Sequence, residues 1–436
     1  MNDAVSSLPV VIVGGGFSGA MLAARLAERG QASVLIERGE VFGPGVAYSA
    51  TLPEHRLNVR SERMSAVVDR PRDFVDWLEE NASSCADPEG FAPRLFYGLY
   101  VQDRLETIRA VRPDLIRQVK GEAVAIDGRT VLLADGRRVE GRAVVLATGN
   151  PAPRTAVAGQ SPRILPDPWA PRALDRVRPE DDILILGSGL TMVDVVLGLE
   201  AQGWRGQATA VSRRGLLPRA HGEHHDAPVA LPPEALIGPL SQRLASARRL
   251  ARAHGWRRVM EGYRPVTAEL WRTATTAERA RFLRHLRPWW DVHRHRIAPE
   301  IAAALDALIA GNRLSVIAGR VVATESFPDA VTLSVTPPRG APQRLTAPWL
   351  IDCSGPGHDA AATPLTAALI AEGRARLDPL KLGLELDEAG RVLHADGAVD
   401  PDLYVLGPPA RATLWETIAV PDIRQRIEAL TDRLTA

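Results

Sequence analysis

The stretch VVIVGGGFSGAMLAARLAERGQASVLIE, residues 10–37, decides the fold of this chain. It begins with four apolar residues, Val10–Val13, which predict a buried strand. A glycine-rich turn follows and opens an alanine-rich segment of helical periodicity that ends near Gly30. A second apolar strand, Val34–Ile36, stops at the acid Glu37. The order of strand, glycine turn, helix, strand and acid predicts a dinucleotide-binding βαβ unit.

The glycines and the acid each have a predicted role in holding the dinucleotide. Gly14 permits the tight turn, Gly16 lets the backbone approach a pyrophosphate, and Gly19 lets the helix pack closely on the strand. The pyrophosphate would meet free N–H groups at the positive end of the helix dipole. Glu37 would accept hydrogen bonds from a ribose 2′-OH and would repel a 2′-phosphate. The residues of this unit that we expect to touch the cofactor are Gly14, Gly16, Phe17, Ser18, Gly19, Glu37 and Arg38.

Composition and charge exclude several classes of protein. The 436 residues suffice for two or three domains, and 45% apolar with 24% charged residues is ordinary for a globular protein. A net charge of +1 creates no field that would attract nucleic acid or acidic membranes. The two cysteines, Cys85 and Cys353, lie too far apart for a CxxC redox pair and are too few for a disulfide framework. Because no apolar run approaches the ~20 residues of a membrane span and no signal-peptide pattern opens the chain, we expect a cytoplasmic protein.

The opening pattern recurs in the middle of the chain, after a proline-rich crossing over residues 151–179. An apolar strand, Asp182–Leu186, is followed by Gly187-x-Gly189 and an apolar helix. Met192 stands where the third glycine would be, so we expect this helix to lie slightly further from its strand. The residues of this second unit that we expect to bind a nucleotide are Gly187, Ser188, Gly189, Leu190, Thr191, Arg213 and Arg214.

The end of the next strand distinguishes the two units. That strand, Ala208–Val211, ends in Ser212-Arg213-Arg214 where the first unit has an acid. A neutral or cationic strand end accommodates a 2′-phosphate that an acid would repel. The second unit is therefore predicted to bind NADP rather than NAD. The alternative interpretation is that the two arginines are a solvated surface pair.

The rest of the chain predicts loops, further strands and a helical insertion. The glycine–proline segment Val41–Tyr48 is predicted to be a loop and not a helix. A strand over Ala143–Ala147 ends in Thr148-Gly149, and another short strand stops at Gly407. Residues 231–308 look mostly helical and carry tryptophans at positions 256, 271, 289 and 290.

Five short motifs carry a family resemblance. They are Gly43-Pro-Gly45-Val-Ala-Tyr48, Leu57-Asn58-Val59, Met64-Ser65-Ala66, Ser212-Arg-Arg-Gly-Leu-Leu-Pro-Arg-Ala-His221 and Trp289-Trp-Asp-Val-His-Arg-His-Arg296. With the two nucleotide units, they are similar to the bacterial FAD–NAD(P)-binding protein family. That family is related to the class B flavin monooxygenases, including the N-hydroxylating enzymes.

The resemblance implies an α/β fold with two Rossmann-like dinucleotide-binding domains. The first would bind FAD and the second NADPH. We expect the FAD domain to be discontinuous, with a first part at residues 1–175 and a return segment at 326–436. The NAD(P) domain would lie between them, at 176–325, with the helical insertion at about 231–308.

The resemblance also adds cofactor contacts outside the two units. Asn58 is the preferred polar residue beside the flavin ring and the one catalytic candidate; the alternative is that it only forms a turn. Many relatives end a late strand in Gly-Asp, where the acid touches the ribityl chain, but here that position reads Gly407-Pro408. We therefore expect this contact from backbone groups near Trp415–Ile418. The added contacts are Gly45, Val46, Ala47, Tyr48, Asn58, Met64, Thr148, Gly149, Gly407 and Thr417.

The implied function is an FAD-dependent, NADPH-using oxidoreductase, in particular a monooxygenase acting on a small polar or amine-bearing metabolite. The alternatives are an NADPH oxidase or reductase without substrate oxygenation, and a non-catalytic flavin-binding redox sensor. The cluster His221–Asp226 lacks a cysteine and a matching downstream pair, so we expect a polar loop near the nicotinamide or a solvated loop, and no metal. The expected partner is a small-molecule substrate, with no nucleic acid and no membrane.

Overall fold

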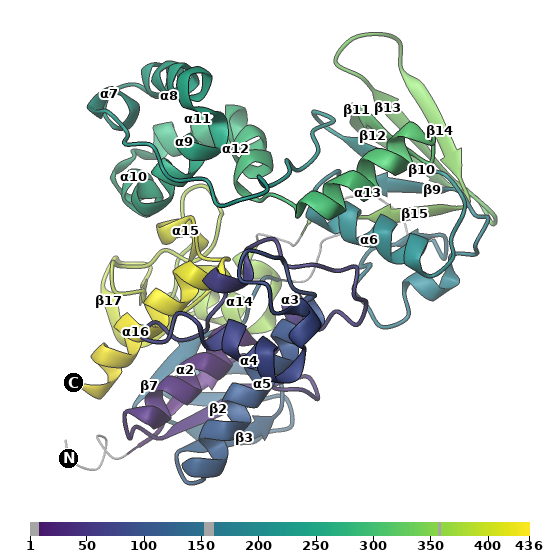
Figure 1. Ribbon diagram of the computed structural model, residues 1–436. Coiled ribbons are helices and arrows are strands. Elements are labelled where there is room, and N and C mark those ends of the chain that lie inside the picture. Colours follow the sequence, from purple (N-terminus) through teal and green to yellow (C-terminus); the bar gives the residue numbers. More distant parts are fainter. Residues whose placement is uncertain (1–7, 152–160, 356–358) are drawn as a thin grey trace.

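The computed structural model describes residues 8–151, 161–355 and 359–436. Figure 1 shows two α/β bodies, one built from both ends of the chain and one from its middle, with a lobe of helices beside them. Residues 152–160 of the predicted proline-rich crossing lie outside the described residues. Within the described part, no helix is both long and apolar enough to cross a membrane.

Both ends of the chain build the first sheet. Among the described residues its six strands are β1 (Val10–Val13), β2 (Ser33–Glu37), β3 (Ile116–Lys120), β7 (Ala143–Leu146), β16 (Arg391–Leu393) and β17 (Val399–Val405). They lie in the order β16-β17-β7-β1-β2-β3, and all neighbours are parallel except β16 and β17. Because β17 pairs with β7, the first domain is discontinuous, as predicted.

Helices and a small sheet cover the two faces of the first sheet. Successive residues of a strand point to opposite faces, so Val10 and Ile12 pack in one core while Val11 and Val13 pack in the other. The first core is covered by α2 (Phe17–Glu28), α4 (Asp73–Asn81), α5 (Arg94–Val111) and α16 (Val420–Thr435). The second is covered by α14 (Pro364–Ala371) and by the antiparallel strands β4 (Ala123–Asp127), β5 (Thr130–Leu133) and β6 (Arg138–Glu140).

One local prediction is wrong. The segment Val41–Tyr48, predicted to contain no helix, ends in a single helical turn, α3 (Gly45–Tyr48). Pro44 stands directly before the turn with φ −67° and ψ −38°, which are helical values that its ring favours. The proline therefore starts a turn here instead of excluding one.

The second sheet repeats this plan. Among the described residues its five strands are β8 (Ile164–Leu165), β9 (Ile183–Leu186), β10 (Ala208–Ser212), β11 (Leu314–Ala318) and β15 (Trp349–Asp352), in the order β11-β10-β9-β15-β8 and all parallel. One face is covered by α6 (Leu190–Ala201) and α13 (Pro299–Ala310). The other face packs on the antiparallel strands β12 (Arg320–Ser326), β13 (Val331–Thr336) and β14 (Gln343–Ala347). Since β8 and β12–β15 share these cores, we propose that the second domain spans about 161–355 rather than 176–325.

A helical lobe is inserted between β10 and α13. Its helices are α7 (Pro233–Leu236), α8 (Leu240–His254), α9 (Trp256–Tyr263), α10 (Thr267–Thr273), α11 (Thr276–His285) and α12 (Arg287–Arg294). In Figure 1 the lobe lies beside α15 (Arg411–Leu414), close to the C-terminal part of the chain. The Trp271 indole N–H donates to the Ala412 carbonyl at 2.9 Å, and the Trp271 ring stacks on Trp415 at 4.4 Å.

The chain enters and leaves this lobe at one place. The Arg219 N–H donates to the Val292 carbonyl at 3.0 Å, and the Ile297 N–H donates to the Arg219 carbonyl at 3.0 Å. The His221 N–H donates to the Ile297 carbonyl at 2.9 Å, and Ala220 and Ile297 form a parallel bridge. The two connections are thus tied together by backbone hydrogen bonds.

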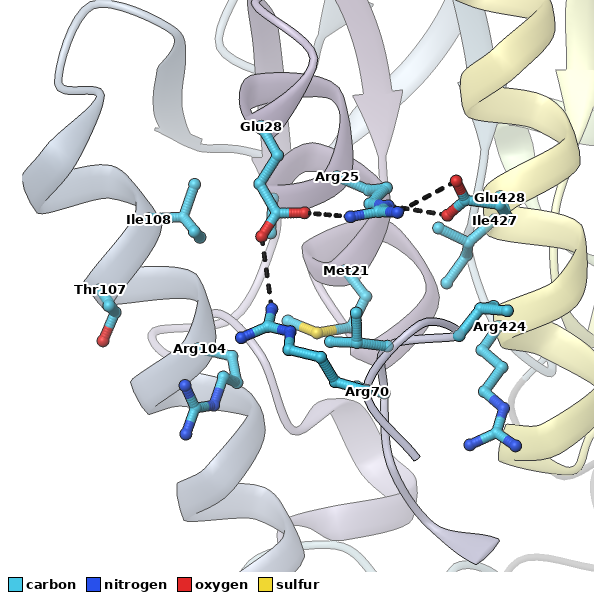
Figure 2. A pocket seen from close by; sticks show the side chains of 14 residues that line it. Met21, Arg25, Glu28, Arg70, Arg104, Thr107, Ile108, Arg424, Ile427 and Glu428 are labelled. Carbon is cyan, nitrogen blue, oxygen red and sulfur yellow. Dashed lines mark hydrogen bonds and ion pairs between the residues drawn. The ribbon is translucent and has the colours of Figure 1, made fainter. Parts of the chain in front are cut away.

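An ion-pair network holds α16 against α2 (Figure 2). Arg25 of α2 donates to both carboxylate oxygens of Glu428 on α16, from Nε at 2.7 Å and from Nη2 at 3.1 Å. Its Nη1 donates to Glu28 at 2.6 Å, and Arg70 reaches the other oxygen of Glu28 at 3.5 Å. The Arg25 side chain is only 16% exposed, so the pair is shielded from water on most sides.

Glu428→Gln should lower the free energy of unfolding by about 1–2 kcal/mol near neutral pH, because the charge-assisted bidentate pair is lost. The hydrogen bond from Arg25 holds the pKa of Glu428 below its usual range. The difference from wild type should therefore be complete above the pKa of the unfolded state, roughly 4.3, and should vanish as the pH falls through the lower folded pKa. Urea unfolding of wild type and variant at several pH values measures this difference in the free energy of unfolding. Asp306→Asn, at an exposed carboxylate of α13, is the control, and an equal effect at every pH would contradict the assignment.

Candidate functional site

The first glycine loop has the geometry of a phosphate cradle. Gly14 has φ +109°, and a side chain there would overlap the Ala147 carbonyl oxygen. At Gly19 a Cβ would overlap the Gly14 carbonyl oxygen, so α2 packs on β1 at a distance that only glycine allows. Gly16 is the N-cap of α2 and has no side-chain cap, which leaves the first N–H groups of the helix free for an anion.

Glu37 connects the end of β2 to this loop. Its two carboxylate oxygens accept from the Gly15 N–H at 2.6 Å and from the Gly39 N–H at 2.8 Å. Each oxygen has a second lone pair, so the carboxylate keeps acceptor capacity for a ribose hydroxyl. Arg38 follows on the exposed side of the strand end. The role of Glu37 toward a ribose stays a prediction.

The predicted contacts from distant parts of the chain gather around the loop. The α3 turn lies directly on it, since a Cβ at Gly16 would be 3.3 Å from the Gly45 Cα. Val46 is 75% exposed on this turn, beside Ala47, which is also exposed. Thr148 and Gly149 follow β7, the parallel neighbour of β1, at the same sheet edge. Gly407 follows β17 and lies so close to α2 that a Cβ would be 2.6 Å from the Ser18 hydroxyl.

The segment before α16 contains buried polar atoms without partners. The Thr417 side chain is wholly buried, and its hydroxyl makes no hydrogen bond to any residue that the structure describes. Glu416 is also buried, and its Oε2 lies 3.4 Å from Arg294 without a hydrogen bond among the described residues. An unpaired buried polar group costs about 1–3 kcal/mol unless a ligand or water satisfies it. The Thr417 hydroxyl is therefore available to a ligand, whereas the Glu416 carboxylate is already held by Arg294 and by the Trp290 indole N–H. The predicted cofactor contact through backbone groups of Trp415–Ile418 stays a prediction.

Three other predicted residues have different surroundings. Met64 is buried in the first hydrophobic core, which accounts for it without a cofactor. The ring of Tyr48 is half-buried, 4.5 Å from the ring of Tyr97, and burial raises its pKa. Asn58 is half-buried, and its side-chain amide makes no hydrogen bond within the described ranges, so it is available to a ligand.

The loop after β10 touches the first domain at Asn58. His221 Nε2 lies 3.0 Å from the Asn58 carbonyl oxygen, which can only accept, so Nε2 carries the proton. Burial, assisted by the charges of Arg296 and Arg60, lowers the pKa of His221 to about 3. Arg60 also donates to the Gly222 carbonyl at 2.7 Å. Of the rest of the predicted polar cluster, Glu223, His224 and His225 are exposed, with His224 beside Glu89. Asp226 is half-buried and lies 3.5 Å from the buried Arg296.

The buried neutral state of His221 predicts a pH dependence of stability. In the unfolded chain His221 takes up a proton near pH 6.5, whereas in the folded chain its pKa is about 3. The free energy of unfolding therefore has its full value above pH 6.5 and decreases as the pH falls below 6.5. His221→Gln should remove about 2 kcal/mol of the loss of stability between roughly pH 7 and pH 5. Urea unfolding at the two pH values tests this. His285→Gln, at an exposed histidine of α11, is the control, and an unchanged pH dependence in His221→Gln would refute the prediction.

The second glycine loop repeats the first around a different strand. Gly187 has φ +96°, and a side chain there would overlap the Cys353 carbonyl oxygen at the end of β15. Met192 is wholly buried at the position of Gly19, where the first unit has no room for a Cβ. A larger separation between α6 and its strand stays a prediction. A Cβ at Gly189, the N-cap of α6, would meet no atom within 4 Å, so this loop is open on that side.

The strand end of the second unit carries two uncompensated positive charges. Arg213 and Arg214 are exposed, and neither forms an ion pair with a carboxylate of the described residues. The Ser188 hydroxyl donates to the Leu216 carbonyl at 2.6 Å and lies 2.7 Å from the Ser212 hydroxyl, which fixes the glycine loop against this strand end. Leu190 and Thr191 occupy the first turn of α6 and are half-buried.

Contacts between the domains involve residues that sequence reasoning missed. Arg94 of α5 forms an ion pair with Asp194 of α6 at 2.7 Å, and His55 Nε2 lies 3.1 Å from the Asp194 carbonyl oxygen. The signal for Asp194 was an acid in the middle of the apolar part of α6, since a buried carboxylate requires a partner. Nothing in the local sequence identified Arg94 or His55 as that partner.

A comparison with known families agrees with this geometry. The family model described as FAD-NAD(P)-binding matches residues 11–151, which contain the first glycine loop, β7 and the Thr148-Gly149 pair that follows it. The predicted resemblance is thereby confirmed for this part of the chain. No curated protein matches the chain in sequence.

Solved structures match nearly the whole chain. The ornithine N-hydroxylase of Kutzneria sp. 744 has a TM-score of 0.66 and 19% identity, with 98% of each chain covered. The reduced ornithine hydroxylase of Pseudomonas aeruginosa has a TM-score of 0.65, 15% identity and the same coverage. The cadaverine monooxygenase of Erwinia amylovora has a TM-score of 0.69 and 13% identity, covering 98% of this chain and 94% of its own. At these identities the likeness shows a shared fold, and it confirms the predicted fold class.

Proposed function

We propose that this chain is an FAD-dependent, NADPH-using oxidoreductase, a monooxygenase that acts on a small polar or amine-bearing metabolite. The observation that carries the proposal is the pair of glycine loops on two parallel sheets, with an acid after the second strand of one unit and two free arginines in the other. The likeness in fold to ornithine and cadaverine hydroxylating enzymes supports the reaction class. The cysteine content favours a cytoplasmic location.

FAD fits the first unit. Its pyrophosphate would lie on the free N–H groups after Gly16, its adenosine ribose at Glu37, and its flavin end toward Thr417 and Asn58. Bound FAD supplies the redox chemistry, and the protein positions it and excludes water. The orphan hydroxyl of Thr417 and the free amide of Asn58 are the polar groups that would orient the flavin end.

NADPH fits the second unit because Arg213 and Arg214 can pair with its 2′-phosphate. The contacts of Asp194 with Arg94 and His55 hold α6, the helix that begins at the second glycine loop, against the first domain. We propose that the two cofactor loops serve one site. The alternatives of an NADPH oxidase or reductase and of a non-catalytic sensor remain as outcomes of the following test.

The proposed function is tested by the visible spectrum of the purified protein. We expect a yellow protein that NADPH bleaches without oxygen, and an oxygenated product when oxygen and a suitable amine are present. NADPH consumption that yields only stoichiometric hydrogen peroxide with every amine tried would indicate an oxidase instead. Bound FAD that NADPH fails to bleach would indicate the sensor.

Gly16→Val should nearly abolish FAD binding, because its side chain would occupy the space of the pyrophosphate beside Gly45. The matched variant is Gly189→Val in the second loop, where the space is open. It should keep FAD and lose reduction by NADPH. The FAD content, measured as released flavin per protein, gives the result. Full FAD loading of a folded Gly16→Val protein would refute the first site.

Arg213→Ala or Arg214→Ala should raise the KM for NADPH roughly ten- to a hundred-fold, since a hydrogen bond to a charged group contributes about 1.5–3 kcal/mol. The KM for NADH and the FAD content should hardly change. Flavin reduction with both nucleotides measures the difference, with Arg112→Ala at an exposed position of the first domain as control. Equal losses for both nucleotides, or none, would place these arginines on the solvated surface.

A further inference from the structure

The helical lobe contains a cavity. Its helices line a space of about 370 Å³ that is partly open to solvent, where a packed core would be expected. Packed interiors contain few voids larger than a water molecule, whereas cavities of roughly 300–1,000 Å³ are typical of small-molecule sites. Around it, Ala235, Val259 and Tyr263 are buried, but most of the apolar side chains packed against them are only partly buried. The lobe therefore leaves apolar surface uncovered inside itself.

Aromatic rings from several elements line the cavity. They are contributed by α9, α10, α11, α12 and the segment after α15, and they comprise Trp256, Tyr263, Trp271, Phe282, Trp289, Trp290 and Trp415. Trp415, which belongs to the C-terminal segment of the chain, stacks on Trp271 with an interplanar angle of 26° and lines the cavity. A wall of this kind suits a ligand with an aromatic ring or an alkyl chain, because such a ligand gains most of its affinity by burying apolar surface.

The charged groups at the cavity favour an anion. Arg243 and Arg248 of α8 both line it, and neither forms an ion pair with a carboxylate in the described ranges. The Arg243 Nε is buried without a hydrogen-bond partner there. Arg279 lines the cavity as well and donates to the Trp271 and Arg272 carbonyls at 2.9 and 3.0 Å. The one carboxylate in the lining is that of Glu278, which accepts from the Thr275 N–H at 2.9 Å and from the Thr275 hydroxyl at 2.8 Å, so the described lining keeps an excess of positive charge.

We propose that this cavity binds an apolar molecule, aromatic or aliphatic, that carries one carboxylate. The carbon body fills the aromatic chamber, and the carboxylate pairs with Arg243 at its α8 side. The cavity and its charges are independent of the two nucleotide loops, so this proposal does not rest on the proposed function.

Binding is tested on the purified full-length chain with whatever FAD it carries. The probe is anilinonaphthalene sulfonate, an apolar aromatic acid whose fluorescence rises in an apolar site, and it is displaced by decanoate, decanol or decylamine. These three competitors share one chain and differ in the terminal group. Decanoate should displace the probe at concentrations at least about ten-fold lower than decanol, and decylamine should be the weakest. No displacement, or equal displacement by all three, would overturn the proposal.

Variants of α8 locate the site. Ala247→Trp, at the cavity wall, should weaken decanoate binding at least about ten-fold, while Ala245→Trp, exposed on the same helix, should leave it unchanged.

A charge variant tests the recognition of the carboxylate. Arg243→Gln should weaken the binding of decanoate by about ten-fold or more and leave the binding of decanol unaffected, with Arg252→Gln as the exposed control. Equal binding by Ala247→Trp and wild type, or equal effects of Arg243→Gln on both competitors, would overturn the assignment. FAD content and NADPH oxidation are measured on the same samples, so failure of this site is distinguishable from failure of the redox function.

Discussion

Close contact between a glycine turn and the neighbouring strand is the constraint on which both nucleotide units depend. A side chain at Gly14 would overlap the Ala147 carbonyl, and one at Gly187 would overlap that of Cys353. Each turn therefore lies against the end of an adjacent parallel strand, and the start of the following helix is brought to the carboxyl edge of the sheet. Open α/β sheets bind their ligands at that edge. The second unit keeps this arrangement although Met192 replaces its third glycine.

The two loops differ in how much of the chain surrounds them. The first is covered by the α3 turn and by Gly407, which lies against the first turn of α2. The second is open at Gly189, and its two arginines are exposed. A group held in the first loop is enclosed by segments from both ends of the chain, whereas one held in the second can enter and leave. This asymmetry suits a resident FAD and a nucleotide that is exchanged in every reaction cycle.

Sequence patterns predicted the local units well because their determinants are local. The glycine spacing, the strand after it and the acid at Glu37 lie within one βαβ unit, and the structure has the same strands and helix there. The partners of Asp194 and the hydrogen bond of His221 to Asn58 join residues more than ninety positions apart, so no periodicity could reveal them. The place of β8 in the second sheet is likewise defined only by its pairing with β15, from which it is distant in sequence. The cavity is a property of helix packing, and the tryptophans of the insertion only indicated that packing would be aromatic.

The joined entry and exit of the helical lobe have an evolutionary consequence. Because residues 219–221 are hydrogen-bonded to residues 292–297, the intervening helices leave and rejoin the second domain at one point. Segments with adjacent ends can be lengthened, shortened or exchanged without disturbing the domain that carries them. Selection can therefore remodel the chamber that receives a small molecule while both nucleotide loops keep their register. A chain of this design can acquire new specificities by changing one module.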